Sequence, residues 1–266
     1  MNLKEKIAHL VNLSEIEYRW CSRHKASYDN DISFSQCGAT FSDVNVCYAY
    51  MHHYFHHKCP KIVQDHRDYF KQEQRGFGED AFHAAWWLLL SEFKPFRMLE
   101  IGVYRGQVIS LWGVISKYLE YPVEIHGISP FSPSGDSVST YLNNLDYMND
   151  VLESFRVWKI NAPVLVKALS TDQEAIGHIQ KYSWDLIYID GSHDYDIALS
   201  DYQLCRDSLK MGGILVLDDA SLGSSYHPPR FAFAGHPGPS RVARECANKE
   251  MRLLAIVGHN NVFQKI

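Results

Sequence analysis

The sequence predicts an α/β fold: a doubly wound, seven-stranded, mostly parallel sheet with an N-terminal helical extension. From residue 97 onward, short apolar runs rich in β-branched residues alternate with segments of helix length. This alternation favours right-handed βαβ crossovers in a parallel sheet. Residues 1–92 instead show the apolar spacing of helices. We therefore expect a helical cap or oligomerisation region at 1–92 and an α/β domain at 93–266.

The helical region begins with the stretch LKEKIAHLVNLSEIEYRW, which places Ile7, Leu10 and Val11 on one helical face. A second helix is predicted by GEDAFHAAWWLLLSEF, because this stretch is long, apolar and free of helix breakers. Its residues Trp86 and Trp87 are expected in the core or in a subunit interface rather than against a cofactor. We expect this region to cover the α/β domain and the protein to form a homo-oligomer.

Seven apolar runs predict the strands of the sheet. The first five are RMLEIGV (97–103), VEIHGIS (123–129), VLVKAL (164–169), WDLIYID (184–190) and GILVLDD (213–219). The last two are LLAIVGH (253–259) and NNVFQKI (260–266). A tight turn at His259-Asn260-Asn261 predicts that these two form an antiparallel hairpin at the sheet edge. The Gly- and Pro-rich loop Gly223–Ser240 is typical of a lid over an active site.

Composition excludes several classes of partner. The formal net charge is −5 with a pI near 6.3 and no sustained Lys/Arg run, which argues against nucleic-acid binding and favours a small-molecule partner. No apolar stretch approaches the ~18 residues of a membrane span, and charges interrupt the N-terminus where a signal peptide needs an apolar core. The six cysteines form no CxxC pair, which indicates reduced structural thiols. We expect a cytoplasmic protein with no membrane partner.

The first predicted strand ends in the stretch EIGVYRG, which contains Glu100, Gly102 and Gly106. In open α/β sheets, ligands bind beyond the carboxyl ends of the strands. Glycines there let the backbone approach a ligand at a helix N-terminus, and Glu100 can accept hydrogen bonds from a cationic or hydroxyl-bearing ligand. An ordinary strand-to-helix turn is the alternative, because the stretch lacks both the G-x-G-x-x-G spacing and the lysine of a phosphate loop.

Three carboxylates follow the fourth and fifth strands: Asp190, Asp218 and Asp219. Because neighbouring strands end at the same edge, these anions should converge and need a counter-charge. Mg²⁺ suits them better than zinc, because the sequence shows no cluster of cysteine or histidine to supply softer ligands. Asp218 and Asp219 can converge only if the chain is already leaving the strand, and Asp219 could instead cap a helix or turn.

His193 lies three residues beyond Asp190, on the turn after the fourth strand. A histidine of near-neutral pKa beside a metal-bound hydroxyl can take up its proton as a general base. The alternative is a histidine that caps a helix or supports the site from behind.

Together these stretches resemble the class I S-adenosylmethionine-dependent methyltransferases, whose fold is Rossmann-like. Within that class the chain is similar to the metal-dependent small-molecule O-methyltransferases related to the macrolide-sugar and novobiocin-sugar enzymes. The resemblance covers about residues 96–266 and rests on LEIGVYRG, YIDGSH and LKMGGILVLDD. It implies a cofactor site made of Glu100, Gly102, Tyr104, Gly106, Ser129, Ser170 and Asp190. It also implies Mg²⁺ on Asp190, Asp218 and Asp219, with His193 as the general base.

One departure from that family concerns the ribose of the cofactor. The family usually places an acid at the end of the second strand, whereas HGISPF has Ser129 there. Either Ser129 binds the ribose hydroxyls or another group replaces the acid, with Asp136 as the candidate.

Several other histidines and one glycine-rich segment invite a functional interpretation. In MHHYFHHKC, His52/His56 and His53/His57 pair along a helix, but no acid or cysteine nearby in the sequence completes a metal site, so we expect a surface or packed helix. Residues 75–80 (RGFGED) either fold over the cofactor pocket or simply start a helix. The long loop adds candidate substrate contacts at His227, Arg230 and His236.

These observations predict a Mg²⁺-dependent enzyme that moves a methyl group from S-adenosylmethionine to a hydroxyl of a small molecule, most simply a sugar of a natural product or a surface glycan. A nicotinamide-dependent oxidoreductase shares such a sheet but requires the missing glycine fingerprint. A glycan-binding domain that keeps the fold without catalysis is the third reading, because fold alone does not prove activity.

Overall fold

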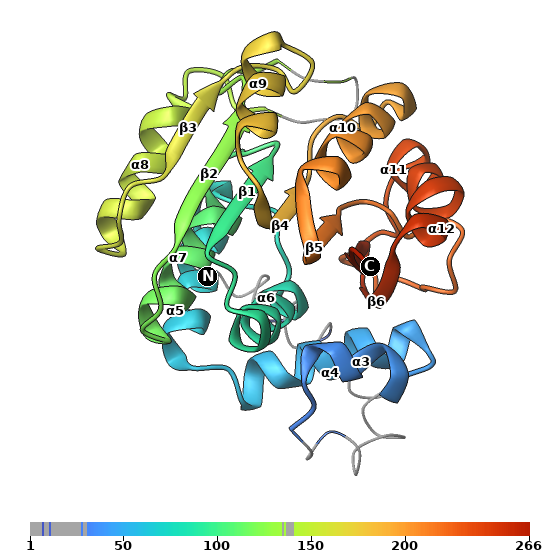
Figure 1. Ribbon diagram of the computed structural model, residues 1–266. Coiled ribbons are helices and arrows are strands. Elements are labelled where there is room, and N and C mark those ends of the chain that lie inside the picture. The colour runs from blue at the N-terminus through green and yellow to red at the C-terminus, as the bar shows by residue number, and fades with distance from the viewer. Residues whose placement is uncertain (1–6, 8–10, 12–27, 29–30, 135, 137–140) are drawn as a thin grey trace.

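Seven strands form one sheet in the computed structural model, which describes residues 7, 11, 28, 31–134, 136 and 141–266. The strands are β1 (Arg97–Ile101), β2 (Glu124–Ser129), β3 (Val164–Lys167), β4 (Trp184–Ile189), β5 (Leu209–Leu217), β6 (Arg252–Val257) and β7 (Asn260–Gln264). Their order is β3-β2-β1-β4-β5-β7-β6 (Figure 1). The first five run parallel, and β7 is antiparallel to both β5 and β6. The predicted doubly wound, Rossmann-like sheet is confirmed, and its order reverses between β1 and β4, where such sheets bind ligands.

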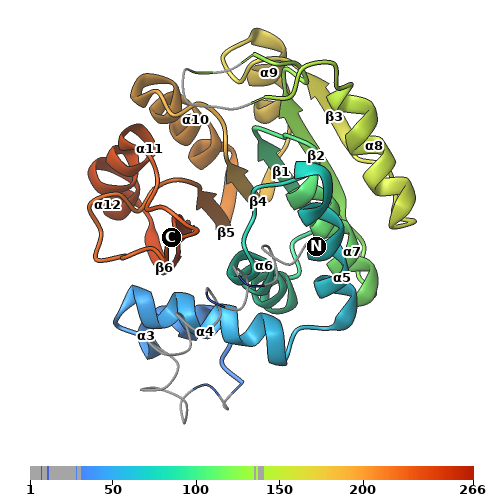
Figure 2. The same cartoon turned by 180° about the vertical axis from the view of Figure 1, so that it is seen from behind.

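Helices cover both faces of the sheet, and further helices come from the N-terminal region. They are α3 (Phe34–Thr40), α4 (Val44–His57), α5 (Lys61–Lys71), η2 (Gln72–Gln74), α6 (Asp80–Phe93), α7 (Gln107–Tyr118), α8 (Tyr147–Val157), α9 (Gln173–Lys181), α10 (Tyr195–Ser208), α11 (Pro237–Val242), η3 (Ala243–Ala247) and α12 (Asn248–Glu250). α4 packs against α6 and β6, so α3 and α4 lie beside the closing hairpin, whereas α5 packs against α7 (Figures 1 and 2).

Two hydrophobic cores lie on opposite faces of the sheet. One face is covered by α6, α7 and α8, with Trp112 and Phe155 fully buried there. The other is covered by α9, α10 and α11, with Ile179 and Tyr202 buried. Trp86 packs edge-on against Trp112, which confirms that it belongs to the core.

The closing hairpin at the sheet edge is confirmed, but its turn is not at the predicted residues. Gly258, with φ of 62°, and His259 make the turn, whereas Asn260 and Asn261 already belong to β7. Gly258 takes the left-handed conformation that glycine adopts without steric cost. His259 therefore lies at the tip of the hairpin, where its carbonyl accepts a hydrogen bond of 2.8 Å from the backbone N–H of Ala220, just beyond β5.

Some sequence predictions fall outside the described part of the chain. The first predicted helix, with Leu10, lies mostly outside it, and so does Cys21. The cysteines within it are free thiols: Cys37, Cys47, Cys59, Cys205 and Cys246. Among the helices described, none is both long enough and apolar enough to cross a membrane.

Candidate active site

Gly102, just after β1, lies directly against the backbone at the end of β4. Its φ is 98°, and a Cβ built there would lie 1.7 Å from the carbonyl oxygen of Asp190. Its N–H also donates to the carbonyl of Ile128 at 2.9 Å. The sequence assigned this glycine to the close approach of a ligand. In the structure, the contact that demands glycine is the one with the Asp190 backbone.

Gly106, at the start of α7, and Glu100, in β1, are two of the predicted cofactor residues. Gly106 caps α7 with φ of 81°. The Glu100 side chain is buried, and its Oε2 has no hydrogen-bond partner. Burial raises its pKa to about 8, a backbone hydrogen bond from Ile109 opposes this, and the charge of Asp218 adds to it. A buried acceptor without a partner is costly, and a cationic or hydroxyl-bearing ligand would satisfy it.

The segment 75–80 reaches over this glycine loop. The N–H of Gly78 donates to Gln107 Oε1 at 3.0 Å, and the exposed ring of Phe77 packs against Tyr104 at 5.1 Å between centroids. The segment therefore does more than start a helix, since α6 begins only at Asp80. Tyr104, a predicted cofactor residue, is packed among aromatic rings there.

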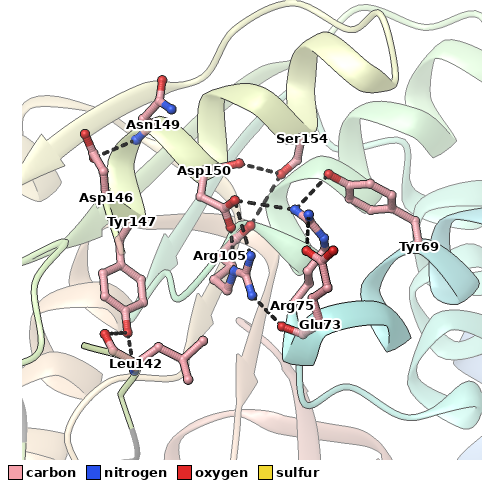
Figure 3. A network of polar contacts seen from close by, with 10 residues as sticks. All are labelled: Tyr69, Glu73, Arg75, Arg105, Leu142, Asp146, Tyr147, Asn149, Asp150 and Ser154. Atoms are coloured by element: carbon pink, nitrogen blue, oxygen red, sulfur yellow. Dashed lines mark hydrogen bonds and ion pairs between the residues drawn. The ribbon is translucent and has the colours of Figure 1, made fainter. Parts of the chain in front are cut away.

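An ion-pair network ties the N-terminal region to the glycine loop and to α8 (Figure 3). Asp150 accepts hydrogen bonds from Arg105 Nε at 2.5 Å and from Arg75 Nη1 at 3.4 Å. Arg105 also donates to the carbonyl of Glu73 at 2.7 Å, and Arg75 donates to the hydroxyl of Tyr69 at 3.1 Å (Figure 3). The loop after β1 is thereby anchored to two other parts of the chain.

Asp190, Asp218 and Asp219 lie at the carboxyl ends of β4 and β5, as predicted. Asp190 is hydrogen-bonded to Asp218, and its pKa is raised by burial and then by the charge of Asp218. Asp219 has φ of 54°, so the chain has left the strand there, as the convergence of the two aspartates requires. The Asp219 carboxylate contacts histidines rather than capping a helix or turn.

Histidines surround Asp219, which corrects the argument that led from the sequence to Mg²⁺. His259 Nδ1 lies 2.8 Å from Asp219 Oδ1 and 3.2 Å from Asp218 Oδ1. His193 Nε2 lies 2.8 Å, and His236 Nε2 3.8 Å, from Asp219 Oδ2. The expected absence of a histidine cluster was wrong because residues far apart in sequence meet here.

Two compact donor groups result at this edge. In each of them the ligand atoms lie within 4.8 Å of one another, and the groups are Asp218–Asp219–His259 and His193–Asp219–His236. The three aspartates alone do not form such a group among the described residues.

Two carboxylates hold His193. Its Nδ1 and its backbone N–H both contact Asp136 Oδ2 at 2.7 Å, and its Nε2 contacts Asp219. Burial alone would lower the pKa of His193, but the hydrogen bond and charge of Asp219, then those of Asp136, raise it. Asp194, not His193, is the N-cap residue of α10, so the helix-capping alternative is wrong. One carboxylate oxygen of Asp136, the candidate ribose ligand, is hydrogen-bonded to His193.

Opposite charges balance within the cluster. Burial alone would raise the pKa of Asp219, but hydrogen bonds from His193 and His259 hold it below the usual range of a carboxyl. Burial would lower the pKa of His259, and Asp218 and Asp219 raise it well above the usual value. Asp219 is therefore an anion between two imidazoles that favour their cationic form.

A cavity of about 330 Å³ opens beside His193. It is lined by Asp136, His193, Asp194, Tyr195, His236, Pro237, Gly238 and Arg241. Arg241 stacks over the ring of Tyr195 at 3.9 Å. The loop residue His236 thus lies at the predicted active edge, whereas His227 bonds through its N–H to Asn45 of α4 at 2.7 Å.

The remaining predicted cofactor residues lie at the ends of β2 and β3. Ser129 is buried at the last position of β2. Ser170 follows β3 and hydrogen-bonds to Asp201 of α10. Burial raises the pKa of Asp201 to about 6, and its Oδ2 has no hydrogen-bond partner.

The paired histidines of α4 do have an acid beside them, contrary to expectation. His56 Nε2 lies 3.2 Å from Asp80 Oδ2, and His52 completes the group. Arg67 and Lys71 also contact Asp80, at 3.1 and 2.9 Å. Two fixed cations on this carboxylate disfavour a metal ion there, so the group is a buried ion-pair cluster.

The sequence analysis missed three residues of the site. His259 comes from the hairpin tip, Tyr48 from α4, and Glu79 from the N-cap of α6, within the segment 75–80 that the sequence analysis noted without giving this residue a role. Glu79 Oε1 lies 3.8 Å from His259 Nε2, and Tyr48 donates a hydrogen bond to the other oxygen of Glu79. Glu79 and Tyr48 carry no motif, because only the packing of α4 and α6 against the hairpin brings them to the site.

Comparison with known protein families identifies one match. A family model described as a methyltransferase domain matches residues 99–220, from the end of β1 to just beyond Asp219. No curated protein matches the chain in sequence.

Solved structures share the fold. A methyltransferase from Podospora anserina bound to S-adenosylhomocysteine is 15% identical, with a TM-score of 0.54 over 78% of this chain and 89% of that one. An O-methyltransferase from Bacillus cereus in complex with the same compound is 13% identical, with a TM-score of 0.54 over 82% of this chain and 97% of that one. These likenesses show that the chain has the Rossmann-like methyltransferase fold.

Proposed function

We propose that the protein is an S-adenosylmethionine-dependent O-methyltransferase that acts on a hydroxyl of a small molecule. The methyltransferase-domain match over residues 99–220 supports this, since that range contains both the glycine loop and the three aspartates. The observation that carries the proposal is the pairing of a ligand-binding edge at Glu100 and Gly106 with a cavity beside His193. The edge at Glu100 and Gly106 can hold the methyl donor, and the cavity beside His193 can hold the methyl acceptor.

The cofactor would lie over the ends of β1, β2 and β4. The unpartnered Glu100 Oε2 suits the ammonium group of the methionine part, and the N-terminus of α7 suits its carboxylate. Further proposed cofactor contacts are Gly102, Tyr104, Gly106, Ser129, Ser170 and Asp190. Ser129 is too short to replace an acid fully at the ribose, so we propose that its hydroxyl makes one of the two ribose contacts.

The acceptor hydroxyl would enter the cavity beside His193. In-line displacement needs the oxygen held close to the methyl carbon and relieved of its proton. We assign the proton to His193, whose ring lines the cavity between Asp136 and Asp219. To act as a base the ring must be neutral and must exchange its Nε2 contact with Asp219 for the acceptor hydroxyl, while Nδ1 stays on Asp136. The polar lining suits a sugar or another polyhydroxylated acceptor from a natural product or surface glycan.

Asp190, Asp218 and Asp219 would hold a divalent cation, for which we propose Mg²⁺. The residues fit an ion, because Asp218 Oδ1 is buried without a hydrogen-bond partner and carboxylate oxygens are the ligands Mg²⁺ prefers. When bound, the ion would lower the pKa of the acceptor hydroxyl. We further propose that residues 1–92 form a cap or oligomerisation region, that the protein is a homo-oligomer and that it acts in the cytoplasm.

The test is methyl transfer from labelled S-adenosylmethionine to a panel of glycosides and catechols, with mass spectrometry to detect the methyl ether. We expect product with at least one hydroxyl acceptor, loss of product after chelation, and recovery with added divalent ions. Full rate after chelation would remove the metal from the proposal, and transfer only to amines or thiols would contradict the acceptor class.

A further inference from the structure

We propose that His259, at the tip of the closing hairpin, is a nitrogen ligand of the divalent cation, so that the site binds transition metals such as Mn²⁺ more tightly, relative to Mg²⁺, than the three aspartates alone would. The inference rests on the proposed function for the presence of an ion, and it names a ligand that comes from outside the three aspartates.

The distances match those of neighbouring ligands on one ion. His259 Nδ1 lies 2.8 Å from Asp219 Oδ1 and 3.2 Å from Asp218 Oδ1. Two donors at about 2.1 Å from an ion and at right angles are about 3.0 Å apart. His259 Nδ1 could therefore occupy a position adjacent to each of the two carboxylates on one ion. A bound ion would take the place of the Nδ1 proton.

A carboxylate lies behind the other ring nitrogen of His259, although beyond hydrogen-bond distance. A metal-binding histidine usually presents its second N–H to a carboxylate, which fixes the ring and increases its basicity. Here Glu79 Oε1 lies 3.8 Å from Nε2, and the hydroxyl of Tyr48 holds Glu79 in place. Phe82 and Phe233 pack against the imidazole, at 4.7 and 4.8 Å between ring centroids. Nδ1 is thereby directed at the two carboxylates.

Imidazole changes which metals the site selects. Carboxylate and water ligands suit both Mg²⁺ and Mn²⁺, whereas an added imidazole favours transition metals over Mg²⁺, with iron, nickel, copper and zinc gaining most. His236 does not supply this ligand in the proposed set, because its Nε2 is 3.8 Å from the other oxygen of Asp219. His193 contacts that same oxygen, so it too lies outside the proposed ligand set.

The experiment uses the whole chain, stripped of metal and loaded with Mn²⁺. Pulsed electron paramagnetic resonance should detect one imidazole ¹⁴N coupled to Mn²⁺ in the unmodified protein. His259→Asn should abolish the coupling and lower Mn²⁺ affinity by about 10- to 100-fold or more, with a smaller loss for Mg²⁺. His236→Asn is the matched control and should keep the coupling. Glu79→Gln should keep it too, with weaker Mn²⁺ binding.

Two results would overturn the inference. One is Mn²⁺ bound to the unmodified protein without ¹⁴N coupling, which needs no variant to fold. The other is loss of the coupling in His236→Asn but not in His259→Asn, which would place the ion on the His193–Asp219–His236 group. Calorimetry with S-adenosylhomocysteine on the same samples tests the proposed function separately, because cofactor binding does not depend on which histidine binds the metal.

Discussion

Gly102→Ala should destabilise the protein far more than Gly106→Ala, although both glycines lie in one loop and have positive φ. The left-handed conformation costs a residue with a side chain about 1–3 kcal/mol at either position. At Gly106 the new Cβ would meet only Val151, with its Cγ1 at 3.2 Å and its Cα at 3.4 Å. At Gly102 it would lie 1.7 Å from the Asp190 carbonyl oxygen, against 3.4–4 Å for an ordinary contact.

The additional cost at Gly102 follows from that separation. Either β1 or β4 must move by about 1.5 Å or more, which overpacking data place at about 1–3 kcal/mol. The movement also strains the hydrogen bond from Asp190 N–H to Ile101, worth about 0.5–1.5 kcal/mol. We expect Gly102→Ala to lose about 3–6 kcal/mol and Gly106→Ala about 1–3, measured by urea unfolding. Equal losses would refute the assignment of Gly102 to the junction of β1 and β4.

Three further predictions concern single side chains. His193→Ala should lower turnover by ~10²–10⁴-fold with cofactor affinity unchanged. The wild-type rate should rise with pH through a pKa above the usual ~6.5 of histidine, because Asp219 and Asp136 raise the pKa of His193. A His193→Ala turnover within threefold of wild type would exclude the base role. Affinity for S-adenosylhomocysteine should rise as pH increases through about 8, because Glu100 must ionise to bind the ammonium group, and Glu100→Gln should flatten this profile in calorimetry. Asp150→Asn should lower the free energy of unfolding by about 3–5 kcal/mol, because it leaves the buried Arg105 without its carboxylate partner. Glu153→Gln, in an exposed ion pair on the same helix, should lower it by under about 1 kcal/mol in the same unfolding assay.

The sequence predicted the sheet well because its signal is local. Each strand is a short apolar run, and the helix-length segments between the first five indicate parallel crossovers. Because parallel strands end at the same edge of the sheet, Asp190 and Asp219 were correctly placed there. The predicted turn at His259-Asn260-Asn261 included His259 correctly, but it missed Gly258, which takes a left-handed conformation, and it included Asn260 and Asn261, which belong to β7.

The environment of those carboxylates could not be predicted from the sequence. His259 reaches Asp219 through the register of the closing hairpin, and Glu79 lies behind it because α6 packs there. Neither contact leaves a periodic or motif signal. The charge balance of the site, and hence its metal preference, depends on these distant contacts.

The central claim, that the glycine loop binds S-adenosylmethionine, is tested most directly by calorimetry of the whole protein with S-adenosylhomocysteine and, separately, with NAD. We predict saturable binding of S-adenosylhomocysteine, weakened in Glu100→Gln, and no binding of NAD. Binding of NAD with none of S-adenosylhomocysteine would contradict the proposal and support an oxidoreductase, and binding of neither would support a domain that keeps the fold without the cofactor.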